Sequence, residues 1–413
     1  MTRNGYEIIA YPETYTDERK LHSVLTSMRK NDPVSWLEPD NYRPFWAITR
    51  HQDITEIELK NDLFINHPRT TLMDIPTEQG ILDFTGGSHL LVRTLVHMDN
   101  PDHKVYRSIT QSWFSPPNLI KLKGEIEVLA KSYVDKMLEN GNECDFVKDI
   151  SNLYPLRVIM NILGVPAVDE GFMLKLTQQL FGGTDDDMMR PKEETEDSNV
   201  IAEFFKYFTS LTEDRRKNPT NDVATLIANA KVDGEQIGHL EAMSYYTIIA
   251  TAGHDTTASS TAGGMLALIE NPQELKKLVE NPSLMPLAVD ESIRWVTPVK
   301  NFFRTPTEDY SIAGKTIKKG DSVMLVYPSG NRDEKIFDNP FEFKVDRSPN
   351  RHLSFGLGAH LCLGKHLAKM EMEILYKEVF SRVKDIELNG EPSWVKASFV
   401  SGLKSLPIKY KPK

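Results

Sequence analysis

One short glycine-rich run around Cys362 constrains this chain more than any other segment. The run reads FGLGAHLCLG over residues 355–364, and a helical pattern follows it at once. Glycines allow crowded or left-handed backbone that a Cβ would forbid, so main-chain N–H groups can approach the sulfur. The start of a helix adds a positive dipole end, which also favours a thiolate. The run alone leaves two interpretations equally open: a metal-binding thiolate and a buried structural thiol.

Two other metal sites near Cys362 are disfavoured by spacing. Cys362, His366 and Met370 follow the order of a blue-copper loop. Residues 363–380 predict a helix, however, and positions eight apart in a helix are about 12 Å apart along its axis. A zinc site that uses the nearby histidines lacks a second cysteine, because the other cysteine, Cys144, is remote and is expected to be incidental. The glycines of the run also do not match a dinucleotide-binding fingerprint.

A second feature is a long apolar stretch with a polar centre. Residues 240–269 predict a buried helix, yet its middle reads AGHDTT over residues 252–257. A glycine inside a helix costs about 0.5–1 kcal/mol relative to alanine, and threonine hydroxyls can bond back to carbonyls and bend the helix. The segment is either a tolerated kink or a polar notch over a ligand. In the second case a hydroxyl would hold an oxygen species and a carboxylate would pass protons to it.

Composition limits the classes of function. The net charge of −10 disfavours nucleic acid and anionic membranes as partners. Two distant cysteines give no disulfide framework, which fits a reducing compartment. The first thirty residues are rich in charge and hold no long apolar run, so we expect neither a signal peptide nor a membrane anchor. We therefore expect a cytoplasmic protein.

Helical periodicity dominates between residues 101 and 291, with clear segments at 119–138 and 199–215. Alternation typical of strands is confined to residues 45–48 and 310–327. The polar stretch 182–197 predicts a loop between helices. Its aspartates, 185–187, are expected to be solvated and not to bind a cation, because no regular series of oxygen ligands follows them.

Several charged residues have two possible interpretations. Glu291 and Arg294 lie three apart, on one face of a predicted helix. Basic groups recur at four further positions: His103, Arg107, Arg304 and His360. Such groups are either solvated surface or a set that binds a dicarboxylate cofactor through charge-assisted hydrogen bonds.

Together these motifs resemble those of the cytochrome P450 monooxygenases, in the order that the family has them. The haem-thiolate signature F-G-x-G-x-H-x-C-x-G is met over residues 355–364 and the distal-helix motif A-G-x-[DE]-T-[TS] over residues 252–257. The E-x-x-R pair is Glu291 and Arg294, and residues 331–347 resemble the family's meander region. Length and the absence of an anchor resemble the bacterial soluble class, and the nearest resemblance is to members that hydroxylate terpineol and other monoterpenes.

The resemblance implies a mainly α fold with small β-sheets, in which haem lies between a long distal helix and the helix after the cysteine loop. It implies a single catalytic domain over residues 1–413. The β-rich parts are expected near residues 35–65, 300–330 and 385–410, and the helical parts at 101–291 and 363–382.

The resemblance also implies roles for particular residues. Cys362 would be the axial ligand of haem b, with O2 as co-substrate, while Asp255 and Thr256 would be catalytic and carry protons to the bound oxygen. Glu291 and Arg294 would be structural. The residues expected to contact the cofactor are His103, Arg107, Arg304, His360, Phe355, Ala252, Gly253 and Gly364. Those expected in the substrate pocket are Ile249, Val299, Phe302 and Val400.

For the reaction, the resemblance favours hydroxylation of a terpenoid or alkyl-aromatic compound. Steroid side-chain hydroxylation and O-demethylation of a methoxylated aromatic or sugar remain open, and residues 86–89 and 185–187 would suit a polar substrate. Other classes are a thiolate-haem isomerase, a peroxygenase or a haem sensor, and the Asp255/Thr256 pair speaks against them.

The implied partners follow from the same resemblance. The chain has no flavin or iron–sulfur motif, so electrons would come from a separate [2Fe-2S] ferredoxin and its reductase. Lys104, Lys365, Lys369 and Arg347 would form a basic docking patch. The protein would act as a monomer on a small molecule, without nucleic acid or membrane.

Overall fold

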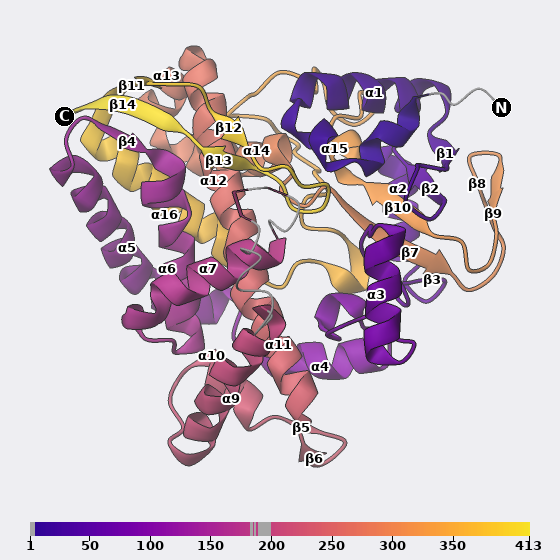
Figure 1. Ribbon diagram of the computed structural model, residues 1–413. Coiled ribbons are helices and arrows are strands. Elements are labelled where there is room, and N and C mark those ends of the chain that lie inside the picture. The colour runs from indigo at the N-terminus through magenta and orange to yellow at the C-terminus, as the bar shows by residue number, and fades with distance from the viewer. Residues whose placement is uncertain (1–4, 182–184, 186, 189–199) are drawn as a thin grey trace.

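The computed structural model describes residues 5–181, 185, 187–188 and 200–413. Helices fill most of the molecule; one sheet lies with the N-terminal helices on the right, and the C-terminal strands lie among helices at the upper left (Figure 1). None of the helices among these residues is both long and apolar enough to span a bilayer. The mainly α fold with small sheets, expected from the resemblance, is what the structure shows.

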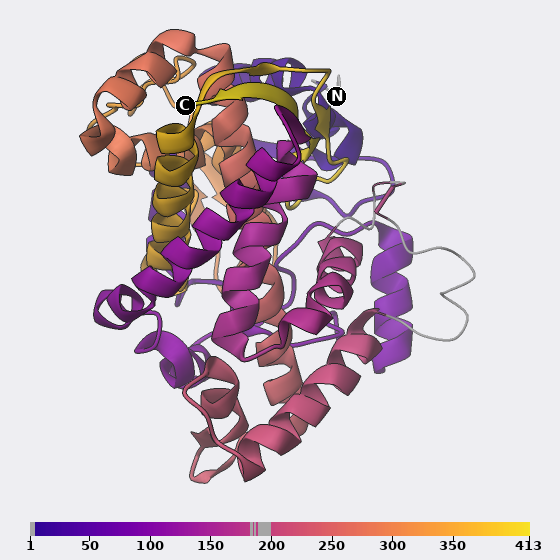
Figure 2. The same cartoon turned by 90° about the vertical axis from the view of Figure 1, so that its left-hand side faces the viewer.

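The helices divide into an N-terminal group and a larger central group. The first group comprises α1 (Glu18–Asn31), α2 (His51–Leu59) and α3 (Ile75–Thr85). The central group comprises α4 (Asp102–Gln111), α5 (Pro116–Glu139), α6 (Leu153–Leu163), α7 (Glu170–Phe181), α9 (Val200–Lys217), α10 (Val223–Ala228), α11 (His239–Ala252), α12 (Asp255–Glu270), α13 (Pro272–Glu280) and α14 (Met285–Val296). The short α15 (Tyr327–Gly330) and the long α16 (Lys365–Arg382) follow, and α16 packs along α5 (Figure 2).

The largest sheet has the order β1-β2-β10-β7-β3. Its strands are β1 (Val34–Leu37), β2 (Phe45–Ile48), β3 (Phe64–Ile65), β7 (Asn301–Pro306) and β10 (Val323–Val326). The central strand β10 is buried along its whole length, and Val323 pairs with Trp46 on one side and Arg304 on the other. This register fixes Arg304 of β7 in the interior.

Smaller sheets complete the β structure. A second sheet orders β11 (Val383–Leu388), β14 (Pro407–Pro412) and β4 (Glu143–Asp145). Three hairpins pair β5 (Lys231–Val232) with β6 (Glu235–Gln236), β8 (Tyr310–Ile312) with β9 (Lys315–Ile317), and β12 (Ser393–Trp394) with β13 (Leu403–Ser405).

The local patterns located most of these elements well. The helices expected at 119–138 and 199–215 are α5 and α9, and the strand expected at 45–48 is β2. The alternating stretch at 310–327 contains β8, β9 and β10. Most of the stretch 182–197 lies outside the described residues.

The prediction of a solvated aspartate run was wrong at Asp185. Its side chain is buried and accepts hydrogen bonds from Lys404 Nζ at 3.1 Å and from the backbone N–H of Lys396 at 2.9 Å. Asp187 also pairs with Lys404, at 2.6 Å. The sequence could not indicate this contact because Lys404 is more than two hundred positions away.

The long apolar helix expected at residues 240–269 is interrupted at its polar centre. Helix α11 ends at Ala252 and α12 begins at Asp255, with Gly253 and His254 between them. A Cβ on Gly253 would lie 2.7 Å from Ile159 Cγ1 of α6, so only glycine allows this close packing. Gly263 of α12 is constrained in the same way by Val296 at the end of α14.

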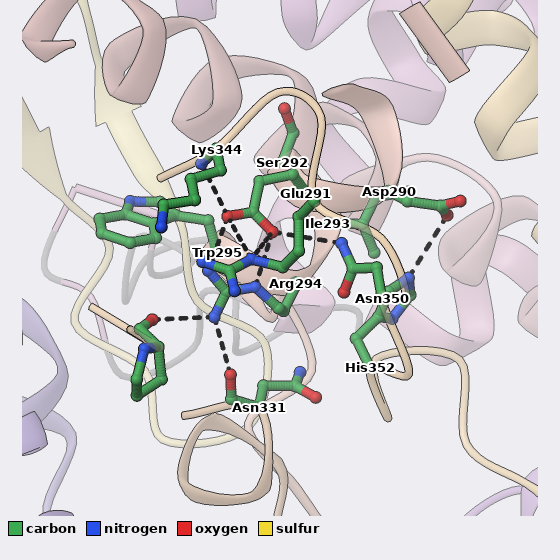
Figure 3. A network of polar contacts seen from close by, with 12 residues as sticks. Asp290, Glu291, Ser292, Ile293, Arg294, Trp295, Asn331, Lys344, Asn350 and His352 are labelled. Carbon is green, nitrogen blue, oxygen red and sulfur yellow. Dashed lines mark hydrogen bonds and ion pairs between the residues drawn. The ribbon is translucent and has the colours of Figure 1, made fainter. Parts of the chain in front are cut away.

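A buried network of ion pairs and hydrogen bonds connects residues 331–347, which follow β10, to α14 (Figure 3). Glu291 and Arg294 are both 0% exposed and form a two-point ion pair, with Arg294 Nε and Nη2 each donating at 2.7 Å. Arg294 Nη1 donates to the carbonyls of Asn331 at 2.9 Å and Pro340 at 3.0 Å. Arg347 Nε lies 3.0 Å from both oxygens of Glu291. Glu291 and Arg294 thus lie buried at the centre of this network, and their structural role stays a prediction.

We predict that Arg294→Met destabilises the protein strongly. The substitution leaves the buried Glu291 carboxylate with less compensation, and removing one partner of a buried ion pair costs about 3–5 kcal/mol. Chemical unfolding of the purified protein measures the change. The control is Arg382→Met, because Arg382 is partly exposed and pairs with Asp135 and Glu378 at the surface, where such pairs contribute about 1 kcal/mol or less. Equal losses for the two variants would contradict a special role of the buried network.

Candidate functional site

A cavity of about 240 Å³ lies between the broken α11/α12 helix and the Cys362 loop. Ala252, Gly253 and Thr256 line it from the helix break, while Cys362 and Gly364 line it from the loop before α16. Nearly all site residues expected from the sequence converge here, although they come from segments up to 260 positions apart.

The Cys362 loop owes its path to two left-handed glycines. Gly356 and Gly358 have φ values of 65° and 66°, and a Cβ on Gly358 would lie 2.8 Å from the backbone oxygen of Glu58. The loop reverses the direction of the chain, so that the N–H of Cys362 donates to the Phe355 carbonyl at 2.8 Å.

The surroundings of the sulfur combine burial with stabilising donors. Burial raises the pKa of the Cys362 thiol, while the backbone N–H of Gly364 and the positive charge of Arg107 lower it. Lys365, which begins α16, contributes both its charge and its backbone N–H. These are the two stabilising effects expected from the sequence: main-chain donors of the loop and the start of a helix.

The four basic residues singled out in the sequence all line the cavity: His103, Arg107, Arg304 and His360. The rings of His103 and His360 are in contact, with their centroids 4.0 Å apart and their planes tilted by 34°. Arg107 Nη2 donates to the Leu361 carbonyl at 2.6 Å, and Arg304 Nη1 donates to the Phe303 carbonyl at 2.8 Å. A cluster of positive and neutral donors without an equal number of acid partners is suited to an anionic ligand.

His360 has a defined tautomer. The Asn66 side-chain amide donates to His360 Nε2 at 2.6 Å, so Nε2 must be the acceptor and Nδ1 carries the hydrogen. Burial and the neighbouring basic groups lower the pKa of His360 far below its usual value. The ring is therefore neutral and keeps one N–H donor. Asn66 lines the cavity too, and no motif in the sequence indicated it.

Glu58, at the end of α2, is the second residue that the sequence did not indicate. Its carboxyl lines the cavity, accepts a hydrogen bond from the Tyr327 hydroxyl at 2.7 Å and lies 3.8 Å from Arg304 Nη2. Its Oε2 is buried without a partner among the described residues. Burial raises the pKa of Glu58 to about 7, against the lowering effects of Arg304 and Tyr327.

The two acid–base candidates of the helix break lie on different sides of it. Thr256 lines the cavity, and its hydroxyl donates to the Ala252 carbonyl at 3.1 Å. Asp255 is not a lining residue; its Oδ1 lies 3.2 Å from His254 Nδ1. The break therefore presents a hydroxyl to the cavity and a carboxylate behind it.

Most of the remaining wall is apolar, although Thr257, Ser260, Tyr327, Ser354 and Glu371 also line it. Of the four residues expected in the substrate pocket, Ile249, Val299 and Phe302 line the cavity. Val400 does not; it pairs with Val299 in an isolated antiparallel bridge and supports that residue from outside. Further apolar residues add to the wall: Leu95, Val96, Phe114, Ile159, Ile248 and Ile293.

The chain is similar to known proteins over nearly its whole length. Residues 16–411 match the family model Cytochrome P450. The chain is 41% identical to Cytochrome P450-terp of a Pseudomonas species, over 97% of this chain and 96% of that protein. It is 31% identical to linalool 8-monooxygenase of Pseudomonas putida, over 97% and 98%. The crystal structure of CYP108D1 from Novosphingobium aromaticivorans superposes with a TM-score of 0.93 at 41% identity and covers 100% of both chains.

We predict that the Glu58→Gln variant loses less stability than the wild type as the pH rises. An acid with a raised folded-state pKa stabilises the fold at low pH, and that contribution is lost as the pH rises from about 4.5 toward 7. The loss can reach about 3 kcal/mol, since each pKa unit corresponds to about 1.4 kcal/mol. Urea unfolding of the cofactor-loaded protein at pH 5, 6, 7 and 8 should show wild type falling relative to the variant. Glu387→Gln, at an exposed position, is the control. Parallel curves for wild type and Glu58→Gln would contradict the prediction.

Proposed function

The chain belongs to the cytochrome P450 family of haem-thiolate monooxygenases, and we propose that it hydroxylates a compact, mostly apolar terpenoid. The observation that supports this substrate class is the distribution of polar groups around the cavity. The four basic side chains lie close to one another, and most of the remaining lining is aliphatic or aromatic, with hydroxyl groups at Thr256, Thr257 and Ser260.

The residues present fit haem. Cys362 offers its sulfur to the cavity, and the four basic residues lie where two carboxylates need donors. Gly364 lines the cavity with no atom within 4 Å of the position that a Cβ would take, so a planar group can approach the loop. Bound haem supplies activation of O2 with two electrons, and its thiolate ligand favours O–O cleavage.

The residues around the cavity have separate roles in this proposal. His103, Arg107, Arg304 and His360 hold the two haem carboxylates, His360 through its Nδ1–H. Thr256 would offer its hydroxyl to the cavity, and Asp255 would supply protons from behind the helix break. Phe355, Ala252 and Gly253 bound the cofactor space.

The apolar wall favours a hydrocarbon-like substrate for a physical reason. Ile248, Ile249, Val299 and Phe302 offer no donor or acceptor, so each buried polar group of a substrate would lose its water without replacement. Phe302 is itself held by an edge contact with Phe399 at 5.3 Å between ring centroids, which restricts the room for bulky molecules. The relatives named for P450-terp and linalool 8-monooxygenase support the same substrate class.

The polar side chains that would suit a sugar are paired with Glu78 or with Lys404, away from the main cavity. His89 Nδ1 lies 2.9 Å from Glu78, which also pairs with Arg69, and Asp185 is paired with Lys404. None of these side chains lines the main cavity. This disfavours O-demethylation of a methoxylated sugar. A steroid side chain or a methoxylated aromatic remains the second candidate, because both present apolar surface.

We infer that electrons arrive from a separate ferredoxin at the surface beside the Cys362 loop. Lys104 of α4 is exposed, Lys365 begins α16, and Lys369 Nζ pairs with Asp290 at 2.7 Å while remaining partly exposed. Arg347 does not belong to this patch, contrary to expectation, because it is buried against Glu291. The patch is therefore smaller than the sequence predicted.

A panel of ligands tests the substrate proposal. We expect monoterpene alcohols and hydrocarbons to shift the ferric haem from low to high spin, because they displace the water from the iron, and to yield a product with one oxygen atom from 18O2. Steroids, methoxylated aromatics and methoxylated sugars are measured at the same concentrations. A full spin shift and product with one of these classes, and none with monoterpenes, would contradict the terpenoid assignment.

Charge reversal tests the docking surface. Lys104→Glu combined with Lys369→Glu should slow reduction by a [2Fe-2S] ferredoxin about tenfold at low salt, because rim charges act mainly on association rates. Lys365 is left unchanged, since its charge acts on the Cys362 sulfur. Lys276→Glu is the control, on the exposed α13 at the opposite end of the helical part from α4 (Figure 1). Unchanged reduction by the double variant would refute this docking site.

A further inference from the structure

His254 occupies the break between α11 and α12 with its side chain fully buried. It contacts two segments that are remote in sequence and the residue that follows it in the chain. Its Nε2 lies 2.6 Å from the carbonyl oxygen of Asn152, before α6. Its Nδ1 lies 3.2 Å from Asp255 Oδ1 and 3.4 Å from Thr177 Oγ1 of α7.

The donors and acceptors around this ring determine where hydrogens must be. A carbonyl only accepts, so Nε2 carries a hydrogen. The hydroxyl hydrogen of Thr177 is already donated to the Leu174 carbonyl at 3.0 Å. Both neighbours of Nδ1 therefore offer lone pairs. A neutral ring facing an ionised carboxylate would place lone pairs against each other at a buried site, which is costly.

One additional proton removes this conflict. It resides either on Nδ1, giving an imidazolium beside a carboxylate, or on Asp255, giving a carboxylic acid that donates to Nδ1. Each form leaves the pair without net charge. In the part of the chain that the structure describes, neither a lysine nor an arginine lies within ion-pair distance of Asp255, so His254 is its cationic partner there.

We propose that His254 and Asp255 hold one shared proton and that this proton is a store for the reaction in the adjacent cavity. The inference rests on the proposed roles of Asp255 and Thr256. Monooxygenation consumes two protons and two electrons for each O2, with one oxygen entering the substrate and one leaving as water. The pair supplies one of these protons, the redox partner supplies the electrons, and solvent restores the proton to the pair.

The geometry gives the two residues different tasks. Asp255 Oδ2 is buried and has no partner among the described residues, so it is the end of the pair that can release the proton. The next residue along the chain, Thr256, lines the cavity. His254 does not line the cavity; it is a positioning residue that keeps Asp255 supplied and oriented. Thr177 places α7 in contact with the same ring.

The shared proton can be observed directly, without substrate or turnover. The haem protein is labelled with 15N-histidine, reduced and bound to CO, and its ring nitrogens are observed by NMR at pH 7. We expect a protonated His254 Nδ1, or a bare Nδ1 together with an infrared band from a protonated Asp255 that disappears in Asp255→Asn. A bare Nδ1 together with an ionised Asp255 would overturn the proposal.

His51 provides an internal control. Its Nε2 also faces a carbonyl, that of Arg351 at 2.7 Å, but its Nδ1 faces the Thr55 hydroxyl at 3.5 Å, with no carboxylate in that position. Burial lowers the pKa of His51. Its Nδ1 should be bare under the same conditions, which shows that the measurement separates the two states.

Two variants connect the proton to turnover. In Asp255→Asn the amide can donate to Nδ1, so the ring should become neutral, and the general acid is lost; we expect about a hundredfold lower product formation. His254→Gln should keep the fold through amide hydrogen bonds, lower product formation about tenfold, and increase both the solvent isotope effect and peroxide release. An unchanged solvent isotope effect and unchanged peroxide release in a folded His254→Gln protein would refute the proposal that this pair supplies the proton. If this variant does not fold, the NMR comparison of wild type with Asp255→Asn decides the question. Because the NMR readout uses no substrate, failure of the terpenoid assignment leaves it unaffected.

Discussion

The buried Glu291 carboxylate is the interaction on which the rest of the structure depends. It binds Arg294 and Arg347 and accepts the Lys344 N–H at 3.0 Å. Arg294 then holds the carbonyl of Asn331. The Asn331 side chain in turn accepts from the Leu353 N–H at 2.7 Å and donates to Ser354 Oγ at 2.9 Å. Ser354 precedes Phe355, whose carbonyl binds the Cys362 N–H. The position of the sulfur thus follows from an ion pair 70 residues earlier.

A separate feature, the raised pKa of the carboxyl groups Glu58 and Glu371 that line the cavity, leaves the cofactor-binding wall rich in positive charge. Carboxylates that could neutralise Arg107 and Arg304 are kept away or kept neutral. Glu58 is the informative exception, because burial raises its pKa to about 7 and limits its charge beside Arg304. Positive charge therefore remains available for the haem carboxylates, and Cys362 lies within reach of the charge of Arg107.

Sequence reasoning located what depends on local chemistry. The Cys362 loop, the polar break in the long helix and the Glu291–Arg294 pair each carry their own signal in a few adjacent residues, and the structure brings them together. It could not locate Asn66, Glu58 or the Lys404–Asp185 contact, because each depends on two segments that meet only after folding. Arg347 was assigned to the surface for the same reason: nothing near it in the sequence shows that it faces Glu291. Val299 and Val400 were both assigned to the pocket, but only Val299 lines the cavity, and Val400 pairs with it in an isolated bridge.

The helix break shows why a local fault can be retained in a buried helix. Gly253 lets α6 approach so closely that Ile159 fills the space of a Cβ, and the helical hydrogen-bond pattern is interrupted there. The interruption frees His254 to turn toward the Asn152 carbonyl and α7, while Thr256 stays on the cavity side. A regular helix would place residues 254 to 256 at fixed 100° steps, without the shift that the break allows. The cost of a glycine in the helix, about 1 kcal/mol, is offset by the packing of α6 and by a three-point anchor for His254. The residues after this break, Asp255 and Thr256, are consecutive but have different surroundings: Thr256 lines the cavity and Asp255 lies behind its wall.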